Sequence, residues 1–435
     1  MIILQHARGN LASTDLLSVE AQYYQTGSLN SIVGPTVSNT RGSSATYVDS
    51  DGLIKSAGNN VLRIDHHPVT GQRLGALVEI NRTNLTRYSG DLVNNTGWAG
   101  SLLSSVSGTG LDSNPSYQIS EWDGTGVHSF ANTGSNSSTA ATSVTSGTVY
   151  TASIFLKKNS SVDWVQLTIG QTGFGTTLYA NFNLSNGTVG NFAGTPTGLP
   201  PTIEQYSNDW YRCSITATAT VTTTSTLNLI IAFTNNTDTT TRIPSYAGSS
   251  TNTVLASMAQ FEASRLATSY IRSVSFSVTR AGDFPTFSAS AFNQPEGVVV
   301  IEYTPKTISQ VATIFVLSGG SLQIRIAKAS STYTVGTQWV GRTTSTGTII
   351  ASSVGSALST SKIAYGYTTS GSILAVNGTI IGTSSTTFST GSVTGIRLGT
   401  GASAAESTDC IGHVRSCRYY KTRVSTEKIR ALSEL

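Results

Sequence analysis

The chain has 435 residues and a formal net charge of +4 at pH 7, and only 11% of its residues are charged, against roughly a quarter in an average globular protein. Serine, threonine and 42 glycines replace the missing charges. This composition excludes an ordinary helical cytosolic enzyme, and 13 Phe, 17 Tyr and 5 Trp argue against a disordered chain. The length indicates two or three domains.

Several partner classes are excluded by what the sequence lacks. It has no run of lysine or arginine, which argues against specific nucleic-acid binding through phosphate contacts. No apolar stretch approaches the length of about 18 residues that a membrane span needs, and the first residues do not form a secretory signal. The three cysteines, Cys213, Cys410 and Cys417, match no zinc spacing, and their odd number argues against a disulfide framework. We expect buried free thiols, no cofactor and no metal site.

The first segment, residues 1–87, carries most of the dense charge and few regular strand patterns. The pair Asp51-Gly52 and the run 65–71 predict turns. This segment is too irregular to build a large core alone. We interpret it as a docking and oligomerisation arm that other chains order, so that its removal would leave soluble sandwiches.

The second segment, residues 88–272, alternates apolar and polar residues with period two, which predicts β-strands. Clear examples lie at 150–157, 165–169 and 211–217. Turn-forming Gly, Asn, Ser and Thr clusters separate them, and Asn186-Gly187 predicts a tight type I′ hairpin. Many short strands with such spacing predict a β-sandwich.

The third segment, residues 283–435, predicts a second sandwich that is linked to the first by residues 280–283. Asn377-Gly378 predicts another type I′ hairpin. One helix is expected at the C-terminus, where Ser425 can cap the helix and Val424 and Ile429 have the spacing of a hydrophobic staple. The fold class predicted for the whole chain is therefore all-β, with two tandem jelly-roll sandwiches.

Particular stretches resemble known families. Three N-terminal stretches resemble segments of tailed-bacteriophage virion proteins, namely 40–54, 63–71 and 82–85. The second segment is similar to carbohydrate-binding-module-like jelly rolls of phage tail and fibre proteins, through 150–157, 209–212 and 258–262. The third resembles the concanavalin A-like lectin/glucanase fold through 412–420 and the helix that follows.

This resemblance implies a non-enzymatic structural protein of a tailed phage virion, made in the bacterial cytoplasm and carried on the extracellular particle. A tail fibre or spike-type appendage is the leading hypothesis, with the N-terminal segment docking to other virion proteins. The same resemblance implies a homo-oligomer, expected to be a trimer, that binds host-surface glycans. A capsid decoration or cement protein is the first alternative, and a glycan depolymerase is the second.

Catalytic residues are not indicated. A glycosidase needs two carboxylates flanking the scissile bond, and Glu121 and Asp123 are the best local pair because residues i and i+2 of a strand share a face. The pair gives only weak support for catalysis, since Asp123-Gly124 also predicts a turn. The third segment lacks the acidic cluster of the glucanases it resembles. We interpret Glu121 and Asp123 as part of a solvated loop and predict no catalytic residue.

Glycan binding is the better functional hypothesis, because sugars stack their apolar faces on exposed aromatic rings. The candidate contacts in the second segment are Trp98, Tyr117 and Trp122, and those in the third are Trp339, Tyr365 and Tyr367. For each ring the alternative is a place in the core or in a protein interface, where large aromatic side chains usually lie.

Overall fold

The computed structural model of the chain describes residues 17–22, 37–94, 97–100, 103–132, 142–196, 199–226, 229–287, 295–306, 312–318, 324–329, 338–343, 348–353, 359–385, 395–398 and 411–435. Within these ranges regular structure is almost entirely β, and the α-helices are two short ones. Neither of these helices has the length and hydropathy to cross a bilayer. The predicted all-β class is confirmed.

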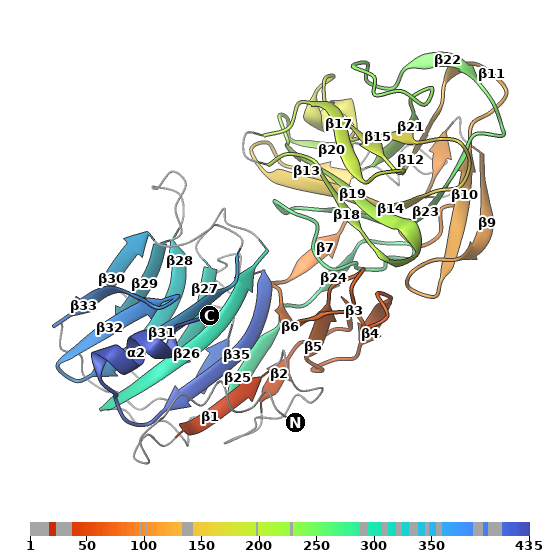
Figure 1. The fold of residues 1–435 in the computed structure, drawn as a ribbon. Helices are drawn as coiled ribbons and strands as arrows, with labels where there is room; N and C mark the ends of the chain where they lie inside the picture. Colours follow the sequence, from red (N-terminus) through yellow and green to blue (C-terminus); the bar gives the residue numbers. More distant parts are fainter. Residues whose placement is uncertain are drawn as a thin grey trace.

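Two six-stranded antiparallel sheets form the middle sandwich (Figure 1). The first, called sheet F here, has the order β18 (Thr202–Gln205), β19 (Trp210–Thr218), β14 (Val149–Lys158), β23 (Thr253–Glu262), β10 (Pro115–Ser120) and β9 (Leu103–Thr109). The second, sheet E, has the order β17 (Thr188–Ala193), β16 (Tyr179–Asn183), β15 (Trp164–Thr168), β21 (Ile230–Phe233), β12 (Ser129–Ala131) and β8 (Ala99–Gly100). Shorter elements connect them: the pair β11 (Gly124–Val127) and β22 (Ser245–Gly248), the pair β13 (Thr142–Val144) and β20 (Thr223–Thr226), helix α1 (Gln171–Phe174) and the 3₁₀ turn η1 (Ser207–Asp209).

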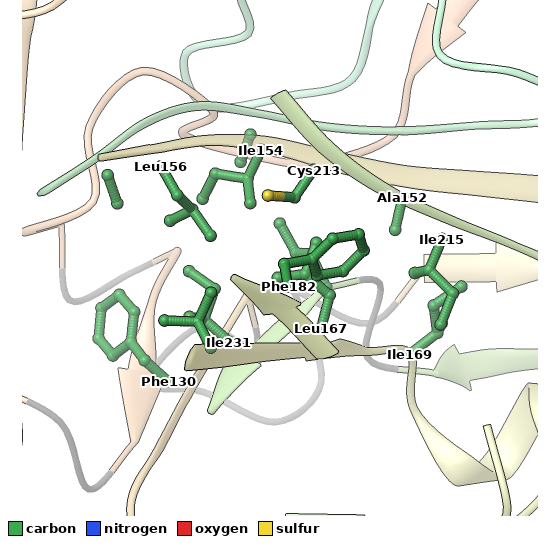
Figure 2. Packing of buried hydrophobic residues seen from close by; sticks show 14 of the residues in the cluster. Phe130, Ala152, Ile154, Leu156, Leu167, Ile169, Phe182, Cys213, Ile215 and Ile231 are labelled. Carbon is green, nitrogen blue, oxygen red and sulfur yellow. The ribbon is translucent and has the colours of Figure 1, made fainter. Parts of the chain in front are cut away.

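The period-two pattern places one face of each strand in the core between the two sheets. Ile154 of β14, Cys213 of β19 and Leu167 of β15 are fully buried there, and Figure 2 shows these side chains pointing toward one another. Burial raises the pKa of the Cys213 thiol well above its usual value, and Cys417 is also a buried free thiol. The expected buried thiols are confirmed at these two positions, and Cys410 lies outside the described residues.

The C-terminal sandwich also has two sheets. In sheet A the order is β33 (Thr379–Ser384), β32 (Gly371–Val376), β31 (Ser361–Thr368), β26 (Glu296–Pro305), β35 (Gly412–Tyr420), β6 (Arg73–Val78) and β5 (Arg63–His66), and β1 (Leu17–Gln22) also pairs with β35. In sheet B the order is β2 (Ser38–Thr40), β25 (Phe284–Phe287), β34 (Gly395–Leu398), β27 (Ala312–Ser318), β28 (Ile324–Ala329), β29 (Gln338–Thr343) and β30 (Thr348–Ser353).

The N-terminal segment differs from the expected irregular arm, because its described residues form strands of this same chain. β1, β5 and β6 belong to sheet A, and β2 belongs to sheet B. Ala76 and Val78 of β6 are buried in the core of the C-terminal sandwich, so these strands supply side chains that this sandwich needs. The middle sandwich is therefore inserted into a discontinuous C-terminal sandwich.

A short neck joins the two bodies. β7 (Arg82–Asn84) enters the middle sandwich and β24 (Val278–Arg280) leaves it, and the two strands pair antiparallel (Figure 1). Inserted domains commonly have neighbouring ends of this kind. The hairpin of β3 (Ala45–Val48) and β4 (Ile54–Ala57) precedes the neck and packs on the outer face of sheet F, with Val48 and Ile54 beside Phe155.

The two predicted hairpin turns have different outcomes. Asn377 and Gly378 have φ of 47° and 77° and form a two-residue turn between β32 and β33, which confirms the type I′ prediction. The prediction at Asn186-Gly187 is wrong, because β16 and β17 close with the pair Asn183–Thr188 and leave four residues in the loop. The Asn183 side chain accepts the backbone N–H of Ser185 at 2.9 Å, which stabilises this wider turn.

Helix α2 (Thr426–Leu432) confirms the C-terminal prediction. Ser425 Oγ accepts the backbone N–H of Lys428 at 3.3 Å as the N-cap. Ile429 is fully buried against sheet A, beside the buried Val424. The helix thus covers the outer face of sheet A with the apolar stripe that its sequence indicates.

Candidate functional site

The structure places four of the six predicted sugar-contacting aromatics in the hydrophobic cores. Their relative exposures are 2% for Trp98, 3% for Tyr117 and 0% for both Tyr365 and Tyr367. Trp98 stacks on Phe130 with ring centroids 5.3 Å apart. These four assignments are corrected, because a ring that is packed on all sides offers no face to a sugar. The side chain of Trp339 lies outside the described residues.

Trp122 is the remaining predicted aromatic, and it is half-buried. Its ring lies over β11, since a Cβ placed on Gly124 would come within 2.0 Å of the ring and one on Gly126 within 3.1 Å. Figure 1 shows β11 and β22 at the end of the middle sandwich farthest from the C-terminal sandwich. The sequence therefore identified one accessible aromatic, at the outer tip of the molecule.

The carboxylates that flank Trp122 are occupied by contacts within the protein. Glu121 is buried and accepts hydrogen bonds from the Tyr246 hydroxyl, from the Ser249 N–H at 2.8 Å and from Asn252 Nδ2 at 2.9 Å. Asp123 accepts the Ser250 N–H at 2.8 Å, and its hydrogen bonds to Ser250 lower its pKa. Both acids thus hold the loop after β22 in place, and the lowered pKa of Asp123 is the opposite of what a general acid needs.

A groove of about 420 Å³ lies where the two sandwiches and the β3–β4 hairpin meet. This volume is within the range of small-molecule sites, which occur preferentially at domain interfaces. The lining residues come from all three segments, with Lys306 from the third: Thr46, Tyr47, Val48, Ile54, Asp65, Leu77, Phe155, Leu199, Pro200, Thr202, Glu204, Tyr206, Arg212, Ser214, Thr216, Arg265, Leu266, Ala267, Ser269, Tyr270 and Lys306. We call this site the junction groove.

Strand β19 supplies the polar part of the groove. Its inward residues fill the core of the middle sandwich, so Arg212, Ser214 and Thr216 face outward from sheet F. Glu204 of the edge strand β18 pairs in register with Arg212 and is exposed. Arg212 was not predicted from the sequence as a site residue. The alternation with Tyr211 and Cys213 indicates that Arg212 points away from the core, but it does not show that the β3–β4 hairpin covers that face.

A buried ion cluster lies at the neck between the two bodies. Asp283 binds Arg41 at 2.7 Å and also binds Arg63, and Arg63 binds Glu79 at 2.9 Å. Arg280 lies 3.4 Å from Glu79, and all five side chains are at most 1% exposed. These residues come from both sides of the insertion. The predicted link at 280–283 is therefore buried and forms ion pairs with the N-terminal segment.

A second buried contact ties the N-terminal segment to the groove. His413 Nε2 donates to Asp65 Oδ2 at 2.8 Å, and the N–H of Val48 donates to Asp65 Oδ1 at 2.7 Å. Burial opposes ionisation of Asp65, but the His413 hydrogen bond and the Lys306 charge outweigh it and lower the Asp65 pKa. Burial lowers the pKa of His413, which favours a neutral imidazole.

The ion cluster predicts a defined loss of stability in acid. Burial alone would raise the pKa of Glu79, but Arg280 and Arg63 lower it well below the ordinary value of 4.5. This carboxylate therefore stabilises the folded state above pH 4.5, and the contribution is lost as the pH falls through the lower folded pKa. Urea titrations from pH 7 downward should show the free energy of unfolding falling below about pH 4.5.

The variant Glu79→Gln tests this assignment. It should be less stable than the wild type at pH 7 and should show a shallower acid decline, because it lacks the ionisable group. Equal slopes in the two proteins would show that Glu79 does not contribute to the acid limb.

The described residues contain no group of three or more His, Cys, Asp or Glu side chains that could hold a metal ion. His67 lies in a turn, where its Nδ1 accepts the N–H of Val69 at 3.2 Å, so its position agrees with the turn predicted for 65–71. The junction groove is lined by arginine, lysine, carboxylate and hydroxyl groups together with apolar side chains.

Comparison with known proteins gives structural similarities only. No protein-family profile and no curated protein matches the chain. Domain 4 of AbnA, a GH43 extracellular arabinanase from Geobacillus stearothermophilus in complex with arabinotriose, is 11% identical, with a TM-score of 0.28 over 35% of this chain and 73% of that one.

The CBM40 of a Ruminococcus gnavus IT-sialidase, bound to α2,3-sialyllactose, is 14% identical, with a TM-score of 0.27 over 33% of this chain and 84% of that one. A Trypanosoma rangeli sialidase in a covalent intermediate is 16% identical, with a TM-score of 0.28 over 34% of this chain and 25% of that one. These neighbours are carbohydrate-binding or glycoside-hydrolase-related proteins, and each similarity spans about one third of this chain.

Proposed function

We propose that this protein binds saccharides in the junction groove and acts without catalysing a reaction. The single observation that carries the proposal is the groove itself, whose lining combines aromatic and aliphatic side chains with hydroxyl and charged groups. Saccharides need this combination, since their C–H faces pack on apolar surface and their hydroxyls need hydrogen-bonding partners.

We further propose that the saccharide belongs to a bacterial host and that the protein is a component of a tailed-phage particle, of the fibre or spike type. The support is the resemblance of the N-terminal stretches to phage virion proteins, together with the low charge and the all-β architecture. Within this proposal the protein assembles as a homo-oligomer with other virion proteins. Mass spectrometry of purified tails and of purified capsids would distinguish an appendage from a capsid decoration protein.

Filling the groove should abolish saccharide binding. Ala267 is half-buried on the groove wall, so Ala267→Trp would occupy the space of a sugar. On a panel of bacterial surface polysaccharides, we expect the wild type to bind and Ala267→Trp to lose at least tenfold in affinity. The matched control is Trp122→Ala at the outer tip, which should retain binding.

The opposite effects of these two substitutions would place the saccharide site at the β11–β22 tip. Binding that survives Ala267→Trp and is lost in Trp122→Ala would assign recognition to the β11–β22 tip and contradict the groove. Binding to no saccharide would contradict the proposal as a whole. New reducing ends after incubation with a bound polysaccharide would show a depolymerase, and their loss in Glu121→Gln or Asp123→Asn would locate its catalytic acids.

A further inference from the structure

Arg212 is a buried cation that lines the junction groove and is 5% exposed. Its guanidinium donates to Ser153 Oγ at 3.1 Å and to the Tyr206 hydroxyl, and it lies 5.3 Å from the centroid of the Phe155 ring. In the described part of the chain it forms no ion pair, and its Nε has no hydrogen-bond partner.

An arginine in this position is unusual, because charges that leave water are normally compensated by a close opposite charge. The ion cluster of the neck illustrates the ordinary case, since Arg41 and Arg63 each contact a carboxylate there. Arg212 has two acids nearby: exposed Glu204 is its cross-strand neighbour but forms no ion pair with it, and buried Glu262 interacts with its charge only at longer range. Burial raises the Glu262 pKa. The groove is thus lined by a buried guanidinium that has no carboxylate at ion-pair distance among the described residues.

Two more cations line the same groove from other elements. Arg265 follows β23 and is half-buried, and its Nε has no partner among the residues described. Lys306 follows β26, and its side chain is 41% exposed and 3.8 Å from Asp65. Asp65 already accepts hydrogen bonds from the protein, so Glu204 at the rim is the only lining acid, among the described residues, that faces solvent.

We infer that the junction groove selects saccharides that carry a carboxylate, and that a hexuronic acid unit binds with this carboxylate directed at Arg212. A guanidinium matches a carboxylate with two parallel N–H donors, and such charge-assisted bonds are stronger than neutral ones. Leu199, Leu266 and Tyr270 then pack against the sugar ring. The inference rests on the proposed function, because it names the class of sugar for the same groove.

The test compares two probes that differ only in the acid. Methyl glucuronide carries a carboxylate where methyl glucoside carries a hydroxymethyl group. Ligand-observed NMR titrations with the full chain should give at least tenfold tighter binding of the glucuronide. Raising the salt concentration should lower the affinity for the glucuronide and leave the affinity for the glucoside unchanged, because only the glucuronide binds through a charge.

Two variants locate the charge. Arg212→Gln should reduce glucuronide affinity to that of the glucoside, and Arg212→Lys should restore part of the difference. If circular dichroism shows that Arg212→Gln does not fold, Lys306→Ala at the exposed rim is used in its place. This variant should lower the affinity for the glucuronide several-fold. Arg430→Gln on helix α2, a half-exposed arginine outside the groove lining, is the matched control and should change neither affinity.

The outcomes separate this inference from the proposed function. Equal affinities for the two probes, both lost in Ala267→Trp, would overturn the acidic specificity and leave saccharide binding in the groove intact. Glucuronide binding that Arg212→Gln leaves unchanged would overturn the role of Arg212. Binding of neither probe, together with no binding to any polysaccharide of the panel, would contradict both.

Discussion

Replacing Asp283 with asparagine should lower the free energy of unfolding by about 3–5 kcal/mol, the usual cost of removing one partner from a buried ion pair. The Asp283 carboxylate is fully buried and binds Arg41 and Arg63, and it also accepts the N–H of Glu79 at 3.1 Å. An amide in its place removes the negative charge and leaves two guanidinium groups short of compensation. Urea denaturation followed by tryptophan fluorescence measures the change.

The control for Asp283→Asn is a substitution in a solvent-exposed ion pair of the same protein. Arg430 and Glu434 lie 3.2 Å apart on helix α2, and both side chains are about half exposed. Arg430→Ala should change the free energy of unfolding by about 0.5 kcal/mol or less, because solvent screens such pairs. Similar effects of the two substitutions would show that the cluster at the neck contributes no special stability.

Deleting residues 1–87 should prevent the C-terminal sandwich from folding. The deletion removes β1, β5 and β6 from sheet A and β2 from sheet B, and it exposes apolar side chains that pack against Ala76 and Val78. It also leaves Arg280 and Asp283 without Arg63. We therefore expect an insoluble or partly unfolded product, in contrast to the soluble sandwiches that the sequence alone indicated.

The complementary deletion removes the middle sandwich. β7 and β24 pair from Arg82–Arg280 to Asn84–Val278, so a short Gly-Ser turn can replace everything between the neck strands. This protein should remain soluble and show a β-type circular dichroism spectrum with cooperative thermal unfolding. A soluble, cooperatively folded product from the 1–87 deletion would contradict the discontinuous sandwich.

Local pattern was enough to predict the strands and their inner faces. The alternation in β14 and β19 correctly places Ile154 and Cys213 in the core, because period two is a property of the extended backbone itself. The helix cap at Ser425 and the turn at Asn377-Gly378 were also predictable, since both depend on residues within one turn of each other. For the same reason the all-β class followed directly from the sequence.

The alternation does not show which face of a strand remains exposed to solvent in the folded protein. Tyr365 and Tyr367 were interpreted as candidate sugar contacts, yet both are fully buried on the inner face of sheet A. Trp122 precedes β11 at the tip and remains partly accessible, with its ring over Gly124 and Gly126. An aromatic ring fits the core and a binding surface equally well by composition, so the sequence could not separate these cases.

The sequence by itself determined strands of the second and third segments, their apolar faces and the capped helix, because each depends on neighbours along the chain. Only the tertiary structure decided that the N-terminal strands complete the C-terminal sandwich, that Arg41 meets Asp283 and that Arg212 lines a groove under a hairpin. These contacts join residues that are 242 positions apart in the case of Arg41 and Asp283. Such pairings depend on which faces the folded chain brings together, and no local periodicity encodes that choice.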